Sequence, residues 1–443
     1  MSETLHIPHR RVEDAPAECR RRERERAEPV TRSRALDLRR FPPVLAFALA
    51  ISGAHGGEPW RGNLGSLIPV MKSIHEERQF PMEFSRRGDL SVAEWQRHGR
   101  AETERTLSYH PAAVPLDMKV RSVTRMDGYE IRSITFATSR HYRVPAFLLV
   151  PTRGQTPFPA VVALHDHGGW FYHGKEKIVE VPGEHAALAT VRARSYGGRG
   201  FANELARRGY VVLAIDAFYW GERRLVHERP PPYLRELVGD LKPAQPEYVI
   251  ATNTYLGGQI QTLNSWLSYV GASWLGIVNH DDRRSIDLLE SVPEVDRQRI
   301  GCAGLSIGGY RSTYLVGTDP RIRAAVITGW MTSLPTTLDL KGASHGGIMD
   351  AFGLHAHLDH PDVATLGAPD AAIFVQNCRR DGLFTLTGMQ LAVEKIERVY
   401  QALNRREFFR AELYDVPHSF DVKMQEDAFD WLDRHLRRAE RKS

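Results

Sequence analysis

The sequence is poor in cysteine and has no long apolar run, and each absence excludes a class of protein. Only three cysteines occur in 443 residues (Cys19, Cys302 and Cys378), and none has the short spacing of metal ligands. An odd, scattered set argues against a disulfide framework and favours a reducing compartment. No stretch of about 18 apolar residues is present, which argues against a membrane-spanning helix.

A strong excess of charge of one sign is also missing. The 59 basic residues nearly balance the 54 acidic ones, for a formal net charge of +5. We attribute much of the basic excess to the arginine-rich N-terminus, and no basic stripe interleaved with aromatic residues stands out elsewhere. The composition therefore argues against a nucleic-acid partner. A hydrophobic fraction of 42% is enough for one large core and an accessory region.

The N-terminal stretch has little apolar material to bury. Residues 1–38 are rich in mixed charge, which predicts a disordered basic tail. The run FPPVLAFALAIS follows Arg39 and Arg40, and residues 39–54 could act as a late signal peptide. Its two prolines and its distance from Met1 favour a packed helix instead. We therefore expect a cytoplasmic protein, with export as the alternative.

Residues 39–118 are predicted to form an N-terminal helical cap that packs near the active site. Within them, Ser91 and Glu94 have the spacing of a capping box, and the segment from Val92 to Leu107 continues without proline. This pattern predicts a helix over 92–107, although Gly99 interrupts it.

From residue 119 to 443 the pattern changes to short apolar strands that alternate with helical segments. Such alternation is typical of an α/β fold with a mainly parallel sheet and helices on both faces. The sheet is entered through antiparallel strands, and its carboxyl edge is where sites of this fold class lie. The expected strands are 119–125, 129–138, 142–150, 159–165, 210–216, 299–305, 323–328, 371–376 and 408–414.

One motif carries the chemistry most directly. Gly304-Leu-Ser306-Ile-Gly308 matches the pattern Gly-x-Ser-x-Gly, with a strand before it and a helix candidate after it. A serine on such a tight, strained turn needs very small residues two positions before and after. Ser306 is therefore the predicted nucleophile of a hydrolase.

A serine hydroxyl needs a base, and the base needs an orienting carboxylate, in the chain order serine, acid, histidine. Asp381 follows the expected strand 371–376, and His418 follows the strand 408–414. We predict that both complete the triad. Asp415 is too close to His418 in sequence to replace Asp381 comfortably.

The developing oxyanion needs two backbone N–H donors. Ile307, directly after the nucleophile, supplies the first, and the loop Asp166-His-Gly-Gly-Trp170 supplies the second. In that loop Gly169 is the first choice and Trp170 the next, because glycine lets the backbone approach a substrate closely.

Two further groups of residues have more than one interpretation. Trp170, Phe171 and Tyr172 could stack on a sugar or aromatic substrate, and core packing explains such clusters at least as often. The run from His355 to His360 contains metal-ligand residue types, but it lies in a loop without helical ligand spacing. We predict no metal site there.

Beyond these motifs, several segments resemble one branch of a known superfamily. They are Leu164-His-Asp-His-Gly-Gly169, Gly209 to Asp216, Gly221-Glu-Arg223, Asp281-Asp-Arg-Arg284 and Val295 to Gly301. Together they resemble the dienelactone hydrolase and acetyl xylan esterase-like branch of the α/β-hydrolases, over about residues 60–438. The resemblance implies cofactor-free hydrolysis of a small ester, with Ser306 as nucleophile, His418 as base and Asp381 as its orienter.

The same resemblance leaves some points open. Dienelactone hydrolases proper use a cysteine nucleophile, so the serine argues against that activity. Asp216 is expected to end its strand as a structural residue, and Asp281 or Asp282 to cap a helix over 283–291. A prolyl-oligopeptidase-like peptidase, a carbon–carbon bond hydrolase and a non-catalytic binding module remain alternatives. A homo-oligomer also stays open.

Overall fold

A single mixed sheet organises the described part of the chain. The computed structural model describes residues 65–338 and 351–437. Nine strands pair in the order β1-β2-β3-β5-β4-β6-β7-β8-β9. The strands are β1 (Lys119–Met126), β2 (Tyr129–Ala137), β3 (Arg143–Pro151), β4 (Phe158–Leu164), β5 (Val211–Ile215), β6 (Val295–Leu305), β7 (Ile322–Thr328), β8 (Ala372–Cys378) and β9 (Phe409–Tyr414).

The direction of the strands confirms the predicted fold class. β1, β2 and β3 are antiparallel, β3 is antiparallel to β5, and every pair from β5 to β9 is parallel. All nine predicted strands are present. β6 begins four residues before its expected start because Val295 already pairs with Phe158, across a register shift.

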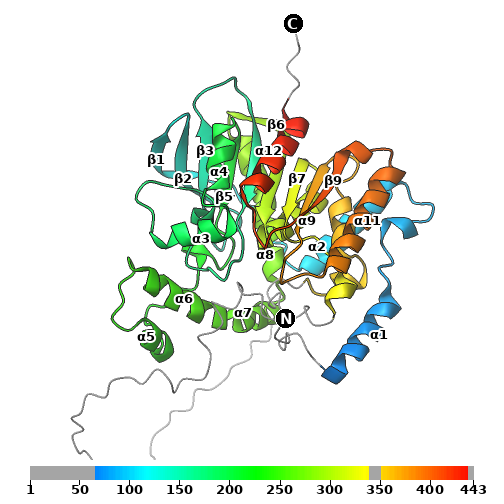
Figure 1. The fold of residues 1–443 in the computed structure, drawn as a ribbon, viewed down its shortest axis with the longest axis horizontal. Helices are drawn as coiled ribbons and strands as arrows, with labels where there is room; N and C mark the ends of the chain where they lie inside the picture. Colours follow the sequence, from blue (N-terminus) through cyan, green and yellow to red (C-terminus); the bar gives the residue numbers. More distant parts are fainter. Residues whose placement is uncertain (1–64, 339–350, 438–443) are drawn as a thin grey trace, which may run out of the picture. The chain divides into compact units, whose positions relative to one another are not determined.

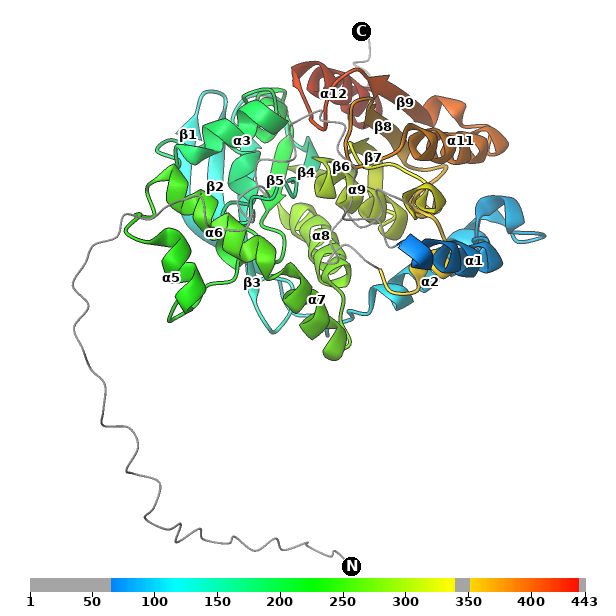
Figure 2. The same ribbon diagram turned by 60° about the horizontal axis from the view of Figure 1, so that its bottom comes forward.

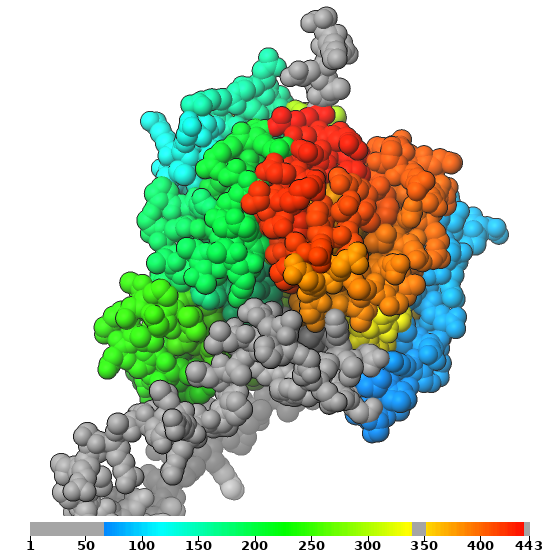
Figure 3. Space-filling view, viewed as in Figure 1, coloured from blue at the N-terminus to red at the C-terminus, as the bar shows by residue number. Residues whose placement is uncertain are grey.

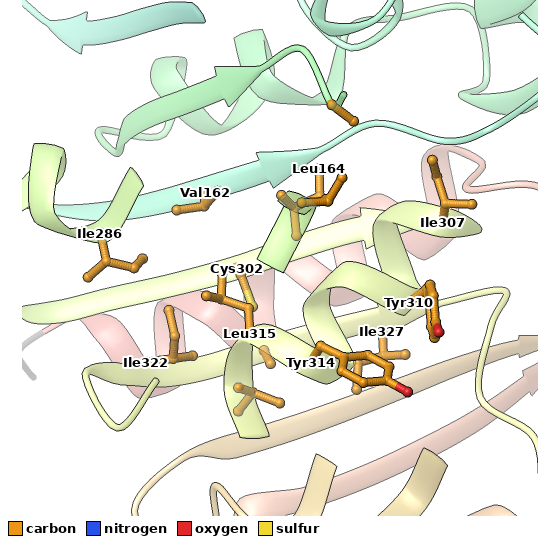
Figure 4. Packing of buried hydrophobic residues seen from close by; sticks show 14 of the residues in the cluster. Val162, Leu164, Ile286, Cys302, Ile307, Tyr310, Tyr314, Leu315, Ile322 and Ile327 are labelled. Atoms are coloured by element: carbon orange, nitrogen blue, oxygen red, sulfur yellow. The ribbon is translucent and has the colours of Figure 1, made fainter. Parts of the chain in front are cut away.

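Alternating side chains of the central strands separate two cores. On β4, Val162 and Leu164 belong to one core, whereas Val161 and Ala163 face the other. The first core lies under α8 (Trp274–Ser291), α9 (Ile307–Thr318) and α11 (Leu386–Ala402). Figure 4 shows its packing, with Leu315 and Tyr314 of α9 close to Cys302 of β6. The fully buried strands explain the continuous apolar runs of the sequence.

The second core lies under α4 (Phe201–Arg207) and α12 (Val422–Leu436), while the short α3 (Ala187–Ser195) lies on the same side of the sheet (Figure 1). Arg208, directly after α4, and Arg199, before it, both make ion pairs with Glu426 of α12 at 2.7 Å. Figure 3 shows these two segments side by side at the surface.

Three helices between β5 and α8 extend beyond one edge of the sheet (Figures 1 and 2). They are α5 (Pro232–Val238), α6 (Pro246–Gly258) and α7 (Ile260–Tyr269). Both ends of this insertion meet, because the indole N–H of Trp274 donates to the carbonyl of Phe218 at 2.8 Å. Its helical segments have the same sequence pattern as an ordinary crossover between parallel strands.

The described part of the predicted cap contains α1 (Ile68–Arg78) and α2 (Val92–Leu107). The Ser91–Glu94 capping box is present as predicted. The side chain of Arg100 on α2 donates to the carbonyl of Gly317, at the C-terminal end of α9, and to that of Leu366, directly after the short helix α10 (His360–Thr365). Ser306 lies at the opposite end of α9, so α2 itself packs away from the nucleophile; the predicted cap over 39–118 stays a prediction, because residues 39–64 lie outside the described part of the chain.

The predicted tail 1–38 and the signal-peptide alternative 39–54 lie outside the described residues. Within the described residues, no helix is both long and apolar enough to cross a bilayer.

The prediction that Asp281 or Asp282 caps a helix is also wrong. α8 begins nine residues earlier than expected, at Trp274, and Ser273 caps it by accepting from the Gly276 N–H. Both aspartates therefore lie inside the helix, where Asp281 pairs with Arg223 and Asp282 with Arg311.

Candidate active site

The turn at Ser306 has the strained backbone that the motif predicts. Ser306 joins β6 to α9 with φ 60° and ψ −121°, and its N–H donates to the carbonyl of Thr328 on β7 at 2.9 Å. A Cβ on Gly304 would lie 2.5 Å from the carbonyl oxygen of Leu164, and one on Gly308 would lie 2.1 Å from it. Both positions therefore require glycine, because β4 passes directly beside the turn.

The structure brings His418 and Asp381 together from two neighbouring strands. The Nδ1 atom of His418 lies 2.6 Å from Oδ2 of Asp381, and the other oxygen of this carboxylate accepts the Leu383 N–H at 2.8 Å. The Asp381 side chain is fully buried, whereas His418 remains 19% exposed. Asp415, the alternative carboxylate close to His418 in sequence, is exposed, and its Oδ1 atom lies 3.4 Å from the Nε atom of Arg380. It is therefore engaged elsewhere.

The His418 ring lies at the same corner of the sheet as Ser306. A Cβ on Gly329 would lie 3.3 Å from the Cε1 atom of His418. Gly329 directly follows Thr328, whose carbonyl accepts the Ser306 N–H. The imidazole and the nucleophile turn therefore both lie beside one short backbone segment at the end of β7, where a Cβ on Gly329 would also lie 3.1 Å from Leu305, the residue before Ser306.

The first predicted oxyanion donor occupies a favourable position. Ile307 is the first residue of α9, and the N–H groups of a first helical turn have no acceptor within the helix. The first bond of the helix runs from the Tyr310 N–H to the Ser306 carbonyl at 2.8 Å. The helix dipole adds positive potential at this end.

The second predicted donor needs a correction. The N–H of Gly169 donates to Nδ1 of His167 at 3.0 Å, and the N–H of Trp170 donates to the His167 carbonyl at 3.0 Å. Two consecutive glycines with positive φ, Gly168 at 58° and Gly169 at 66°, fold the loop back on itself. Both N–H groups are thus used inside the loop rather than offered to a substrate.

The three aromatic residues after this loop have different surroundings. Phe171 is 1% exposed, and its ring packs against His167, Tyr219 and Trp220, so it belongs to the core. Trp170 and Tyr172 are partly exposed. The insertion reaches this loop, because the Tyr172 N–H donates to the Asn253 side chain of α6 at 2.8 Å.

Sequence reasoning missed an aromatic wall beside the nucleophile turn. Trp330, two residues after Thr328, packs against Tyr310 of α9 with ring centroids 4.3 Å apart. It also meets Phe384, three residues after Asp381, at 5.3 Å. Tyr310 follows Ser306 and Phe384 follows Asp381 closely in sequence, but the sequence pattern does not show where these side chains point.

Sequence reasoning also missed a buried polar network beneath the loop after β4. Lys177 lies 3.1 Å from the Asp166 carboxylate, which also accepts the Tyr196 hydroxyl at 2.8 Å. His165 accepts the Ala217 N–H at Nε2, 3.1 Å away, and burial lowers its pKa well below the usual value. This histidine is therefore neutral and structural.

One group of carboxylates has the ligand types of a metal site. Glu176, Asp216 and Glu222 bring one oxygen each to within 4.8 Å of the others. The ammonium of Lys175 lies among them, at 2.8, 2.8 and 2.9 Å. Burial raises the pKa of Asp216 to about 6; for Glu176 burial acts in the same direction, but Lys175 lowers its pKa to about 2. The donors are thus committed to a lysine, and Asp216 is structural, as expected.

The side chains of the His355–His360 run make local contacts, and the rings of His355 and His360 pack edge to face with centroids 4.5 Å apart. The Nδ1 atom of His355 faces the Leu358 carbonyl at 3.1 Å, and His357 pairs with Glu102 of α2 at 3.1 Å. Asp359 and Asp362 form the capping box of the short helix α10 (His360–Thr365). These contacts explain the run by local structure.

Comparison with known proteins agrees with this architecture. No family model matches the chain. A Bacillus subtilis (strain 168) protein described as a putative hydrolase, YtaP, is 24% identical over 227 residues, which is 51% of this chain and 62% of that protein. The chain therefore matches less than two thirds of this relative's length.

Solved structures extend the similarity to most of the chain. A putative acetyl xylan esterase from Bacteroides fragilis NCTC 9343 matches with a TM-score of 0.59 and 16% identity, covering 79% of this chain and 82% of the other. A glucuronoyl esterase from Solibacter usitatus matches with a TM-score of 0.53 and 14% identity, covering 77% and 91%. At these identities the likeness concerns the fold.

Proposed function

We propose that this chain, which has the α/β-hydrolase fold, is a serine esterase that cleaves carboxylic esters through an acyl-enzyme. Ser306 is the nucleophile, His418 the general base and Asp381 the carboxylate that orients it. The observation that carries the proposal is the 2.6 Å contact between His418 and Asp381 beside the strained Ser306 turn.

The proposed reaction has two steps. The Ser306 hydroxyl attacks the ester carbonyl while His418 takes its proton, and the Ile307 N–H binds one side of the oxyanion. His418 then protonates the leaving alcohol. In the second step it activates water, which releases the acid from Ser306. Asp381 holds the imidazole in the tautomer that these proton transfers require.

We infer the substrate class from the solved structures that share this fold, and not from a substrate subsite of this chain. The two esterases named above act, by their descriptions, as acetyl xylan and glucuronoyl esterases. We infer a small ester, including esters of carbohydrates, for this chain. Trp170 and Tyr172, which are partly exposed, are the aromatic side chains proposed to contact it, while the buried wall of Tyr310, Trp330 and Phe384 supports the site from behind. Phe171 is left out because its ring is packed in the core.

Replacing the nucleophile gives the direct test. Ser306→Ala should reduce kcat for p-nitrophenyl acetate by at least about 10⁴-fold and abolish labelling by a fluorophosphonate probe, because it removes the hydroxyl that His418 is proposed to activate. Ser312→Ala removes a buried serine of the same helix, whose hydroxyl bonds to the Gly308 carbonyl, and should retain labelling. Equal labelling of wild type and Ser306→Ala would overturn the proposal.

A further inference from the structure

We propose that Lys177 is a positioning residue that fixes the peptide N–H of His167 as the second oxyanion donor. The inference rests on the proposed esterase function and identifies a group that neither motif spacing nor the predicted donors Gly169 and Trp170 indicated.

Lys177 is held in one place by the loop that follows β4. Its side chain is fully buried, and its ammonium donates to the carbonyl of Asp166 and, at 3.3 Å, to that of His167. The Asp166 carboxylate lies 3.1 Å away and balances the charge. Because an unpaired buried ammonium is very costly, this arrangement of carboxylate and carbonyls strongly favours one conformation of the loop.

The direction of the Asp166 carbonyl determines the direction of the His167 N–H. In a trans peptide the C=O of one residue and the N–H of the next point in opposite directions. The Asp166 carbonyl faces Lys177 and also Nδ1 of His165, at 2.9 Å. The His167 N–H therefore points away from the ammonium. Within the described ranges, no acceptor bonds to this N–H.

The same peptide lies beside the nucleophile turn. Leu164 at the end of β4 is paired in register with Gly304, two residues before Ser306. A Cβ on Gly308 would lie 2.1 Å from the Leu164 carbonyl oxygen and 3.2 Å from that of His165. The chain therefore leaves β4 along the first turn of α9, where Ile307 offers the other N–H, and His167 follows two residues later.

The positive charge of Lys177 also makes the His167 N–H a stronger hydrogen-bond donor. A cation bound to the carbonyl oxygen of a peptide polarises that peptide and makes its N–H a better hydrogen-bond donor. This effect is largest when negative charge develops on the substrate oxygen, so it should favour the transition state over the bound ester.

The test compares two buried lysines of the same short segment. Lys177→Met removes the contacts with the Asp166 and His167 carbonyls. Lys175→Met is the matched control, because the Lys175 ammonium donates to the carboxylates of Glu176, Asp216 and Glu222 rather than to the carbonyls of the loop. Each variant is assayed as the full chain, after its melting temperature and fluorophosphonate labelling have shown that it folds and retains a reactive Ser306.

We expect Lys177→Met to lower kcat for p-nitrophenyl acetate by about 10- to 100-fold with KM changed by less than about threefold, since a donor that acts in the transition state is misaligned. The affinity for a trifluoromethyl ketone, which forms an oxyanion adduct with serine, should fall by a similar factor. Lys175→Met should keep both values close to wild type. Lys177→Arg should restore part of kcat.

The outcomes separate this inference from the proposed function. If wild type hydrolyses the ester, Ser306→Ala does not, and folded Lys177→Met keeps its kcat and its ketone affinity, the role of Lys177 is refuted while the esterase stands. Equal losses of kcat in the two lysine variants also refute it, because the effect would then be general destabilisation. If wild type has no esterase activity and no labelling, the proposed function itself fails.

Discussion

At the scale of single residues, the site depends on a few exact contacts between distant parts of the chain. The carboxylate of Asp381 is fully buried and engages His418 through one oxygen and the Leu383 N–H through the other. Such a carboxylate sets both the orientation and the tautomer of the imidazole. The effect of Asp381 on the imidazole tautomer can therefore be tested with a variant that keeps the shape of its side chain.

Asp381→Asn keeps the shape of the side chain but favours the wrong imidazole tautomer. We expect kcat to fall by about 10³- to 10⁴-fold at neutral pH, with the loss of free energy of unfolding much smaller than that of a core truncation. Steady-state kinetics on p-nitrophenyl acetate measures the first effect and urea denaturation the second. Asp415→Asn, at the exposed carboxylate near His418 in sequence, should retain activity within about twofold. The opposite ranking of the two variants would contradict the assignment of Asp381.

Residues of the site differ in how far the sequence could predict them. Ser306, Asp381 and His418 stand next to strand ends, so strand order alone placed them at one edge. The second backbone donor that we propose could not be found this way. Gly168 and Gly169 permit many turns, and only the contacts of Lys177 and Arg194 with the loop carbonyls decide which N–H stays free of the loop.

At the scale of elements, the strands were predictable because each is a short apolar run between turn residues. The bounds of the helices that cover the sheet were harder to predict. Asp281 and Asp282 resemble a helix start in the sequence, but α8 already begins at Trp274. Their partners Arg223 and Arg311 are distant in sequence, and a buried ion pair between distant residues leaves no local pattern. The insertion α5–α7 was missed for a similar reason, since helical segments are expected in any crossover between parallel strands.

The ion pair between α8 and α9 gives a prediction at this scale. Asp282 binds Arg311 through two contacts, at 2.6 and 3.0 Å, and both side chains are fully buried. Asp282→Ala leaves the guanidinium buried without its partner, so we expect a loss of about 3–5 kcal/mol in the free energy of unfolding, measured by urea denaturation.

Asp287→Ala is the matched control on the same helix. Asp287 pairs with Arg284 and Arg321, and all three are partly exposed. Its removal should cost about 1 kcal/mol or less. If the two variants lost the same stability, the Asp282–Arg311 pair would not be the contact that fixes α9, and with it Ser306, against α8.

At the scale of the whole molecule, buried histidines make stability depend on pH. Burial lowers the pKa of His167 and of His173 to about 4. In the unfolded chain both take up protons near pH 6.5, whereas the folded protein accepts them only near pH 4. These two side chains thus bind more protons in the unfolded state across this window, and we expect their contribution to lower the free energy of unfolding as the pH decreases from about 6.5 to 4.

His173 provides the test of that dependence. Its Nδ1 accepts the indole N–H of Trp170 at 3.0 Å, which requires the neutral ring. His173→Gln keeps an acceptor but does not titrate, so its melting temperature should decrease less than that of wild type between pH 7 and pH 4.5. His141→Gln, at an exposed position, should follow the wild-type slope. Parallel slopes for wild type and His173→Gln would show that His173 is not a source of the acid sensitivity.

The hydrogen bond between Trp274 and Phe218 closes the base of the α5–α7 insertion. Because the residues before and after this insertion meet, its helices can change in length or sequence without altering the distance between β5 and α8. Differences among related chains in the part that flanks the Tyr172 loop can therefore be confined to 232–269, while the contacts of Trp220, Arg223 and Ser273 with the core stay the same.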